Sequence, residues 1–382
     1  MRLEIVIIGG GVIGLSIAWE LSRAGCRRIT VIERARIGSE ASWAAAGILA
    51  PTVEAHGEST FYDLCSASRK MFPQLAAELL DETGIDIELD KSGTLMAAFD
   101  DLEAEELDIT FAAQRKLGFG VDRLSPTETI SAEPEISADV RGSLLYPEDW
   151  QVENRRFTAA LASSVRQSGL RLIEETVVNS LIIQNGRVEG VETLVGDRIM
   201  ADVVVLATGA WTSLIKTTAG PLPIDVRPVK GQIIGYAPGP RRLSRVIFGR
   251  SGYLVPRRDG RVLVGATVED AGFDREASVD AREELKNCGI RIAPFLKDAV
   301  IEEHVTGLRP FAADGLPVIG PISGVSGAYA ATGHYRNGIL LAPLTAKVVA
   351  EAIVEGKDSP LVSEFSPNRD FARGSMAGAG TN

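Results

Sequence analysis

The amino-acid sequence predicts an α/β fold in two domains, one built on a parallel sheet and the other on a mostly antiparallel sheet. A chain of 382 residues with 45% hydrophobic and 24% charged residues is long enough for two hydrophobic cores. Its first thirty residues alternate a strand, a glycine turn, a helix and a second strand. Its middle part carries short strand-like runs separated by turns instead of further helices.

The first strand is expected over residues 3–8, a nearly continuous apolar and β-branched run that is typical of burial on both faces of a sheet. Gly9, Gly11 and Gly14 follow it and form a G-x-G-x-x-G motif. In a Rossmann-type unit the first glycine permits a tight turn and the second lets the backbone approach a pyrophosphate. The third lets the helix pack closely on the strand. The N-terminus of the helix then faces the phosphates.

The helix is expected to stop at Gly25, and a second strand over residues 29–32 ends at Glu33. A carboxylate at this position can accept hydrogen bonds from ribose hydroxyls, and it argues against the 2′-phosphate of NADP. The pattern therefore predicts a dinucleotide site and leaves NAD and FAD open.

Charge and composition exclude several classes of partner. A net charge of −11 disfavours nucleic acid and anionic membrane surfaces. The cysteines are scattered and odd in number, and the three histidines have no ligand spacing; they are Cys26, Cys65, Cys288, His56, His304 and His334. We therefore expect no disulfide framework and no metal. The N-terminus leads directly into a strand and no run reaches the length of a membrane span, so we expect a cytoplasmic protein without a signal peptide.

The next part of the chain mixes helices with short strands. Small residues over 38–48 suit either tight packing or a close approach of backbone amides to a ligand, and packing is the simpler interpretation. Apolar residues over 61–79 recur at helical spacing. Strands over 85–89 and 93–98 and an acidic helix over 100–117 follow. Ser125, Pro126 and Glu128 predict a capped helix start.

The segment from residue 146 to residue 211 decides between the two dinucleotides. We expect a hinge at 146–150, a helix at 154–168, a strand at 170–173, and a hairpin over 177–193 that turns at Asn185 and Gly186. A buried strand over 202–206 then ends at Ala207, Thr208 and Gly209. An NAD enzyme would continue with further βαβ repeats, whereas a hairpin intervenes here, and this favours FAD.

The last third of the chain contains the second sheet and a long helix. Strands are expected over 229–236, 252–256 and 261–266, and a helix over 281–292. A final amphipathic helix over 339–354 follows glycine-rich backbone, so its N-terminus could face the cofactor. These elements divide the chain as follows: 1–84, 141–225 and 310–370 form the FAD-binding domain, 85–140 and 226–309 the substrate-binding domain, and 371–382 a disordered tail.

Several motifs in the same order give the chain a resemblance to a known family. They are Gly9 to Gly14 with Glu33, Ser42 to Gly47, Ala207 to Trp211, Pro228 to Gly231, Tyr253 to Arg257, Val264 to Thr267, Gly307 to Pro310, and Gly333 to Pro343. With them the chain resembles the D-amino acid oxidase superfamily of flavoproteins, and within it the glycine oxidase family of the thiamine-pathway type, over residues 4–368.

The resemblance implies which residues border a non-covalently bound FAD. Val12 and Ile13 would lie over the pyrophosphate, and Glu33 and Arg34 at the adenosine ribose. Val178 would touch the adenine end. The flavin side would be bordered by Ala41, Ser42, Ala46, Gly47, Ile48, His334, Tyr335, Arg336, Asn337, Gly338, Ile339 and Leu340. Relatives with covalent flavin use a late cysteine, and none follows Cys288.

The resemblance also implies the substrate site. Arg309 would hold a substrate carboxylate in a two-pronged ion pair, helped by Tyr253, with Arg336 nearby. From the residues alone, Arg309 also fits a structural ion pair, Tyr253 a core aromatic and Arg336 a turn or surface position. His334 would orient or pack and would not act as a base.

The implied activity is FAD-dependent oxidative deamination of glycine and small D-amino acids, or of sarcosine, to the 2-oxo acid, ammonia and hydrogen peroxide, in thiamine biosynthesis. Its partners would be a small amino acid, molecular oxygen and further copies of the chain. Val268 and Ser251 differ from a glycine oxidase pattern with methionine and histidine there, which leaves the substrate preference open. Two alternatives are a D-amino acid dehydrogenase that uses a quinone or another acceptor, and a flavin-binding protein without turnover.

Overall fold

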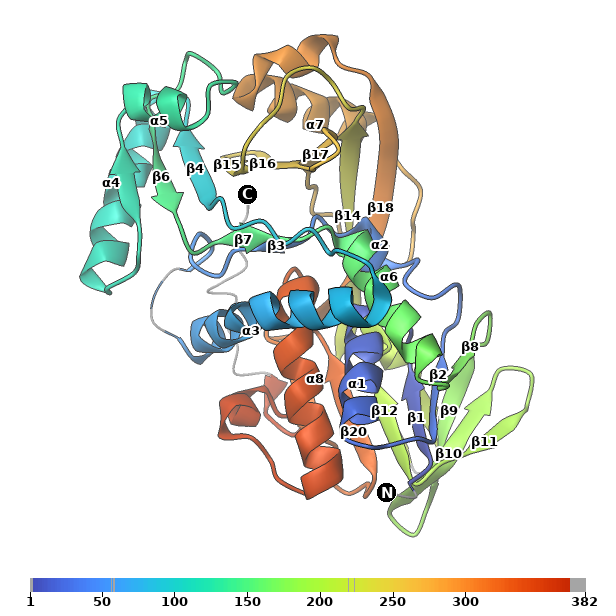
Figure 1. Cartoon of the computed structure of the whole chain (residues 1–382). Coiled ribbons are helices and arrows are strands. Elements are labelled where there is room, and N and C mark those ends of the chain that lie inside the picture. The colour runs from blue at the N-terminus through green and yellow to red at the C-terminus, as the bar shows by residue number, and fades with distance from the viewer. Residues whose placement is uncertain (1–2, 56, 58, 219, 223, 372–382) are drawn as a thin grey trace.

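The strand at the start of the chain lies in the middle of a six-stranded sheet (Figure 1). The computed structural model describes residues 3–55, 57, 59–218, 220–222 and 224–371. The sheet has the order β19-β20-β12-β1-β2-β8, and every pair from β20 to β8 is parallel. Its strands are β1 (Ile5–Ile8), β2 (Ile29–Ile32), β8 (Arg171–Ile173), β12 (Val203–Leu206), β19 (Val318–Pro321) and β20 (Ala328–Thr332).

The two faces of this sheet bury different layers. Side chains of β1 alternate, so that Ile5 and Ile7 join one hydrophobic cluster and Val6 and Ile8 join another. The first cluster is shared with four helices, namely α1 (Val12–Arg23), α3 (Thr60–Thr83), α6 (Asn154–Gln167) and α8 (Gly338–Glu355). The second is shared with a smaller sheet in the order β11-β10-β9-β13. Burial on both sides explains why β1 is apolar throughout.

The smaller sheet contains the predicted hairpin. Its strands are β9 (Val178–Gln184), β10 (Arg187–Thr193), β11 (Arg198–Met200) and β13 (Lys216–Thr217). Asn185 and Gly186 join β9 to β10, and both have positive φ, 50° and 73°. A two-residue turn of this kind requires left-handed backbone at both positions, which asparagine and glycine tolerate best.

An eight-stranded, mostly antiparallel sheet forms the other half of the molecule (Figure 1). Its order is β18-β14-β17-β16-β15-β4-β6-β5, with a parallel pair at β15 and β4. Its strands are β4 (Thr94–Ala98), β5 (Asp122–Leu124), β6 (Gly142–Tyr146), β14 (Val226–Tyr236), β15 (Val246–Gly249), β16 (Gly252–Pro256), β17 (Val262–Gly265) and β18 (Ile301–Ala312). The fold class predicted from the sequence is confirmed.

The remaining elements connect or cover the sheets. They are α2 (Ala41–Ala44), α4 (Asp101–Lys116), α5 (Pro126–Ala132), α7 (Val279–Ile292), the short pair β3 (Ile48–Leu49) and β7 (Trp150–Gln151), and the 3-10 helices η1 (Gly209–Leu214), η2 (Pro294–Asp298) and η3 (Pro360–Phe365). The expected cap of α5 is present as a complete capping box between Ser125 and Glu128.

Two expectations about strands differ from the structure. Residues 85–89 form no strand, because Glu88 adopts a positive φ of 55° and its amide donates to the Asp86 carboxylate at 2.8 Å. The strand β18 was not predicted, although it is twelve residues long. Its sequence contains Gly307 and Pro310, which oppose a strand in the interior of a sheet, but β18 lies at the sheet edge, where proline is tolerated.

We propose that the chain has the two predicted domains, but that two of the predicted boundaries between them lie further along the chain. β6 and the end of β18 both belong to the eight-stranded sheet, so the boundaries at 140/141 and 309/310 should follow Tyr146 and Ala312. Of the predicted tail 371–382, all but Phe371 lies outside the described residues.

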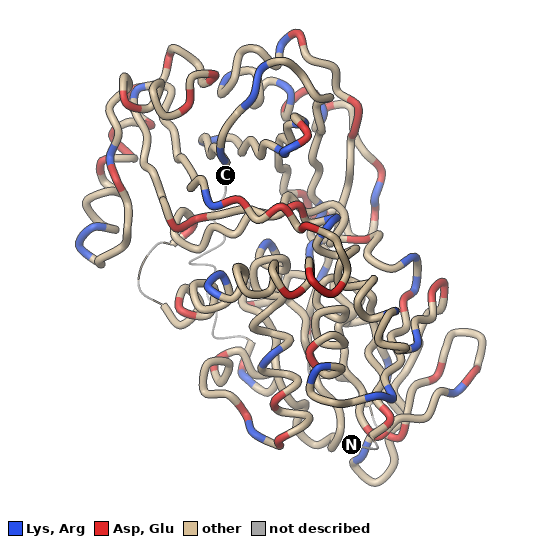
Figure 2. The backbone as a smooth tube through the Cα atoms, in the orientation of Figure 1, with Lys and Arg blue, Asp and Glu red and all other residues tan. Residues whose placement is uncertain are grey.

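In the described part of the chain, no helix is both long and apolar enough to cross a membrane. Acidic and basic residues are both spread over the whole visible chain (Figure 2).

We predict that Gly14→Ala lowers stability and weakens retention of the cofactor. A Cβ at this position would lie 1.9 Å from the carbonyl oxygen of Gly9, so α1 would have to move away from the glycine turn. Overpacking of this kind costs about 1–3 kcal/mol. Thermal unfolding and the fraction of protein purified with flavin measure the effect. Gly120→Ala is the control, because a Cβ there meets nothing within 4 Å. Equal behaviour of the two variants would contradict the packing role.

Candidate active site

One cavity is lined by residues from both large sheets, and it gathers most of the residues predicted to bind cofactor or substrate. The predicted residues that line it are Gly9, Gly11, Val12, Ile13, Glu33, Arg34, Ala41, Ser42, Ala46, Gly47, Ile48, Val178, Tyr253, Arg309, His334, Tyr335, Arg336, Asn337, Gly338 and Ile339. The structure places Gly14 and Leu340 outside the lining. Gly14 packs on Gly9, and Leu340 is buried in the core with its carbonyl accepting from Ser68 Oγ at 2.6 Å.

The glycine turn brings backbone to the cavity wall. Gly9 has a φ of 110°, and a Cβ there would lie 2.2 Å from the carbonyl oxygen of Ala207 at the end of β12. Above Gly11 a Cβ would meet only Ser42 Oγ, at 3.1 Å. The turn is therefore tight against the sheet on one side and open on the other, which fits a ligand that approaches the backbone closely.

Glu33 is buried and holds the glycine turn. Its carboxylate accepts from the amides of Gly10 at 2.8 Å and Ala35 at 2.9 Å. Burial raises the pKa of Glu33, and the two amides oppose this rise. Each carboxylate oxygen can accept a second hydrogen bond, so the group can also meet a hydroxyl in the cavity.

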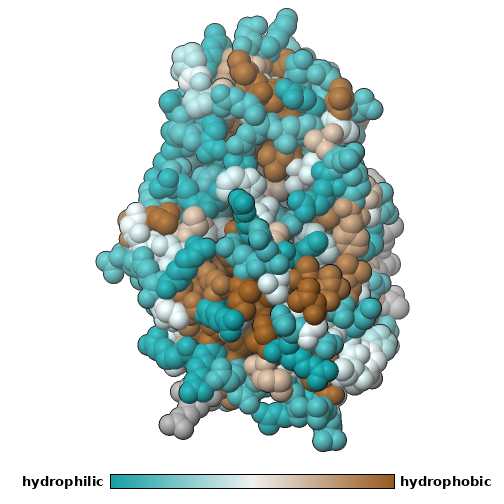
Figure 3. All heavy atoms as spheres, turned by 90° about the vertical axis from the view of Figure 1, so that its right-hand side faces the viewer, coloured by the Kyte–Doolittle hydropathy of each residue, from teal (hydrophilic) through white to brown (hydrophobic). Residues whose placement is uncertain are grey.

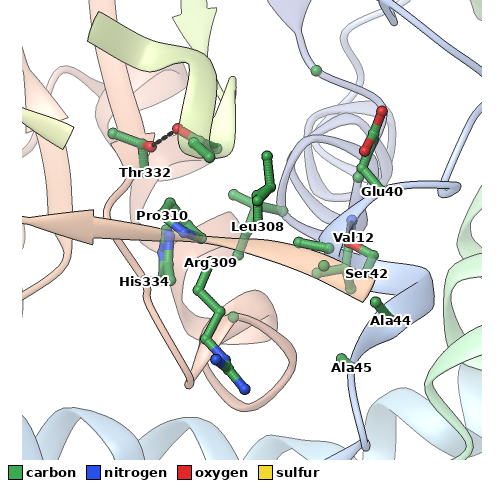
Figure 4. Close-up of a pocket in the computed structure, with 18 of the residues that line it drawn as sticks. Val12, Glu40, Ser42, Ala44, Ala45, Leu308, Arg309, Pro310, Thr332 and His334 are labelled. Carbon is green, nitrogen blue, oxygen red and sulfur yellow. Dashed lines mark hydrogen bonds between the residues drawn. The ribbon is translucent and has the colours of Figure 1, made fainter. Parts of the chain in front are cut away.

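Ser42 connects the small-residue segment to the first helix. Its Oγ accepts from the amide of Val12 at 2.9 Å, at the N-terminus of α1, where Figure 4 shows the two residues side by side. Its carbonyl accepts from Asn154 Nδ2 at 2.7 Å. Gly47 has a φ of 73°, and a Cβ there would lie 2.0 Å from the carbonyl oxygen of Val152. The small residues therefore pack tightly, as the simpler interpretation of this segment expects, and several of them also line the cavity.

The far end of the cavity carries a cation on an aromatic ring. The guanidinium carbon of Arg34 lies 4.3 Å from the ring centroid of Trp211, and both residues line the cavity. Val178, which is buried in β9, lines the same cavity. Exposed apolar side chains at this rim include Val177 and Leu214. Figure 3 shows the molecule from the right-hand side of Figure 1, and an apolar area lies in the lower half of this face.

The turn before α8 forms another wall. His334 Nε2 lies 3.0 Å from Thr345 Oγ1, and burial lowers the pKa of His334 to about 3. The imidazole is therefore neutral, and it packs against α8 through Thr345. Tyr335 has a positive φ of 48°, and its amide donates to the carbonyl of Pro310 on β18. Asn337 is the N-cap of α8, whose first residues reach the cavity.

Arg309 extends from β18 into the open part of the cavity (Figure 4). Its Nη1 donates to the carbonyl oxygen of Thr267 at 3.0 Å, with the carbonyl oxygen of Lys230 at 3.4 Å. Burial lowers the pKa of Arg309, but a guanidinium stays protonated in proteins. Among the described residues, no carboxylate forms an ion pair with Arg309. The cavity thus contains a fixed positive charge that is held by backbone carbonyls alone.

Tyr253 and Arg336 lie close enough to Arg309 to influence its pKa electrostatically. Tyr253 is buried in β16, and burial raises the pKa of its hydroxyl, so the phenol stays protonated. Arg336 Nη2 lies 3.4 Å from the carboxylate of Glu54, which also lines the cavity and raises the pKa of Arg336. The structure therefore brings the three predicted residues together, and it adds one acid.

Sequence analysis missed Glu54 and the group that positions it. Glu54 ends a turn whose amides, from Thr52 and Val53, donate to the carboxylate of Asp149 at 3.1 and 2.7 Å. Gln114 Nε2 on α4 donates to the carbonyl oxygens of Thr52 and Ala55 at 3.1 Å. These contacts join positions far apart in the chain, so no local spacing could have indicated them.

Comparisons with known proteins identify the family of the chain. Residues 4–352 match the family model for DAO, the FAD dependent oxidoreductases. The chain belongs to this family, and FAD is therefore its cofactor.

Two curated relatives and one solved structure illustrate the similarity. Over 97% of this chain, it is 38% identical to the bifunctional protein ThiO/ThiG of Trichormus variabilis, of which it spans only 55%. It is 36% identical to a glycine oxidase of Pseudomonas aeruginosa over 94% of this chain and 96% of that protein. The crystal structure of glycine oxidase from Bacillus cereus superposes with a TM-score of 0.88 at 33% identity, covering 97% of this chain and 99% of that one.

We predict that Asp149→Asn flattens the dependence of stability on pH. Burial raises the pKa of Asp149 from 3.8 to about 7, so the folded state holds this proton more tightly than the unfolded chain does. The contribution of Asp149 to stability is therefore complete below about pH 4 and lost as the pH rises to about 7. Thermal unfolding across this range measures it, with the exposed Asp139→Asn as control. Parallel curves for wild type and Asp149→Asn would contradict the assignment.

Proposed function

We propose that the protein oxidises glycine and small D-amino acids, with oxygen and water, to the 2-oxo acid, ammonia and hydrogen peroxide. Sarcosine is a further candidate, and it would release methylamine in place of ammonia. One observation carries the substrate class. Arg309 is a guanidinium in the cavity whose partners are two backbone carbonyls, and it leaves a planar fork for an anion. A carboxylate matches this fork with two parallel charge-assisted hydrogen bonds. The names of the relatives support glycine as the amino acid, and the resemblance to the thiamine-pathway type supports thiamine biosynthesis as the destination of the product.

The residues fit FAD as the group that fills the rest of the cavity. The open face of Gly11 would meet the pyrophosphate, Glu33 the ribose of the adenosine, and Arg34 with Trp211 the rim beside it. Ser42, Ala46 and Gly47 would lie along the flavin. When bound, FAD accepts a hydride from the α-carbon of the substrate. None of the described cavity residues is a cysteine, which supports a non-covalent cofactor.

The residues of the chain would then contribute orientation. Arg309 would fix the carboxylate, and the protonated Tyr253 would donate a further hydrogen bond. The ion pair of Arg336 and Glu54 would neutralise the second guanidinium, so a monoanionic acid group would settle on Arg309. His334, neutral and turned to Thr345, would exchange no proton with the substrate. Correct placement of the α-carbon supplies most of the rate enhancement in this account.

We predict that Arg309→Ala lowers kcat/KM for glycine roughly 100-fold, mainly through KM, because two charge-assisted hydrogen bonds are lost. The flavin spectrum should stay nearly unchanged, since the cofactor is held elsewhere. Arg198→Ala is the control, because that side chain is exposed on β11 and pairs with Glu192. A wild-type KM in Arg309→Ala would remove the basis of the proposal.

We predict that the yellow protein bleaches under anaerobic conditions on addition of glycine and regains colour in air with release of peroxide. Comparing glycine, sarcosine, D-alanine and D-proline ranks the substrates. Bleaching without reoxidation by oxygen would favour the alternative of a dehydrogenase that uses a quinone or another acceptor. If no amino acid bleaches the flavin, the protein is a flavin-binding protein without turnover.

We further propose a cytoplasmic homo-oligomer. The net charge of −11 and the three free, buried cysteines are compatible with a reducing compartment without nucleic-acid or membrane contacts. Light scattering of the FAD-loaded protein measures the number of copies.

A further inference from the structure

Gly231 lies directly beneath the guanidinium of Arg309. A Cβ built on Gly231 would lie 2.2 Å from Nη1 and 2.3 Å from Cζ and Nη2 of Arg309. The backbone of Gly231 itself does not require glycine, because its φ lies outside the left-handed range. Glycine is therefore required at this position because the side chain of Arg309 crosses it.

The register of the sheet explains this contact. β14 and β18 are antiparallel, with Val229 opposite Arg309 and Gly231 opposite Gly307. The side chain of Arg309 leans diagonally by two residues and lies on Gly231. Diagonal neighbours of this kind are within reach of long side chains.

The neighbouring strand repeats the arrangement for the second substrate residue. Tyr253 on β16 is paired with Gly265 on β17, and a Cβ on Gly265 would lie 2.6 Å from both Cζ and Oη of Tyr253. Arg309 and Tyr253, the two side chains proposed to bind the substrate, therefore both pack over a glycine.

We propose that Gly231 is a positioning residue that sets the height of the Arg309 guanidinium above β14 and so tunes carboxylate binding. The proposal rests on the proposed function, in which Arg309 binds the substrate carboxylate. Non-bonded carbon atoms are most stable at about 3.5 Å, so a methyl group at this position would lift the guanidinium by about 1 Å. The charge-assisted hydrogen bonds that would hold a carboxylate on the guanidinium would then be misaligned, which weakens binding. The bond from Nη1 to the carbonyl of Thr267 would be stretched by the same movement.

The variant Gly231→Ala should still fold. The added methyl group meets the far end of a flexible side chain, and no backbone atom is among its three nearest neighbours. The guanidinium can move into the cavity, where it already points (Figure 4). The loss should therefore fall on ligand binding and should spare the sheet.

A double-mutant cycle with Arg309→Ala tests the proposal. Binding of glycolate, an unreactive carboxylate of the size of glycine, is measured by calorimetry on the FAD-loaded protein, together with KM and kcat for glycine. Gly231→Ala should weaken glycolate binding at least 10-fold and raise KM more than it lowers kcat, with the flavin spectrum and thermal unfolding unchanged. In the Arg309→Ala background, Gly231→Ala should change nothing further, because its effect acts through Arg309.

Gly235→Ala is the matched control. It adds the same methyl group to β14, outside the cavity lining, and should leave glycolate binding unchanged.

The remaining outcomes separate the two proposals. A wild-type affinity in Gly231→Ala, with Arg309→Ala severely impaired, would overturn the positioning role and leave the function intact. The same fold-change in both backgrounds would also overturn it, because Gly231 would then act through the strand. If Arg309→Ala binds glycolate as tightly as wild type, the proposed function itself fails.

Discussion

The interaction on which the site depends is the hydrogen bonding of the Arg309 guanidinium to two backbone carbonyls, one within the eight-stranded sheet and one just beyond it. Lys230 and Thr267 supply these carbonyls from β14 and from the segment after β17. A buried charge without an opposite charge is costly unless a ligand compensates it. The sheet tolerates this arrangement because the side chain faces a cavity, where a carboxylate can complete its hydrogen bonds.

The six-stranded sheet and its helices form the opposite wall of the cavity, which Arg309 faces. β1 and α1 present the open side of Gly11, and α8 presents its N-terminus through the turn at His334 to Asn337. β18 packs closely on α2 at the same cavity, since a Cβ on Gly307 would lie only 2.7 Å from Ala44 Cβ. In the proposed function, the cofactor would lie against β1, α1 and α8 and the substrate against the eight-stranded sheet, with α2 packed between them at β18.

The part of this arrangement that sequence could predict is the part encoded locally. The Asn185–Gly186 hairpin and the cap at Ser125 depend on residues within a few positions of one another, and both are present. The glycine turn and Glu33 could be predicted through the spacing of a known motif, although the Glu33 carboxylate meets the Gly10 amide across 23 positions. The strand β18 could not be predicted, because only its position at the sheet edge makes Pro310 acceptable.

Long-range contacts define the residues that sequence analysis missed. Glu54 meets Arg336 across 282 positions of the chain, and Asp149 holds the Glu54 turn from 97 positions away. Gly231 belongs to the motif Pro228 to Gly231 of the resemblance. Glycine is needed there because the side chain of Arg309 crosses it, and this contact follows only from the register of β14 and β18.

The most direct measurement is a crystal structure of the FAD-loaded protein with glycolate. We expect both carboxylate oxygens to lie on the Arg309 guanidinium, with the Tyr253 hydroxyl beside them and the α-carbon toward the flavin. A glycolate bound to Arg336 with the Glu54 pair broken, or a carboxylate placed away from Arg309, would contradict it.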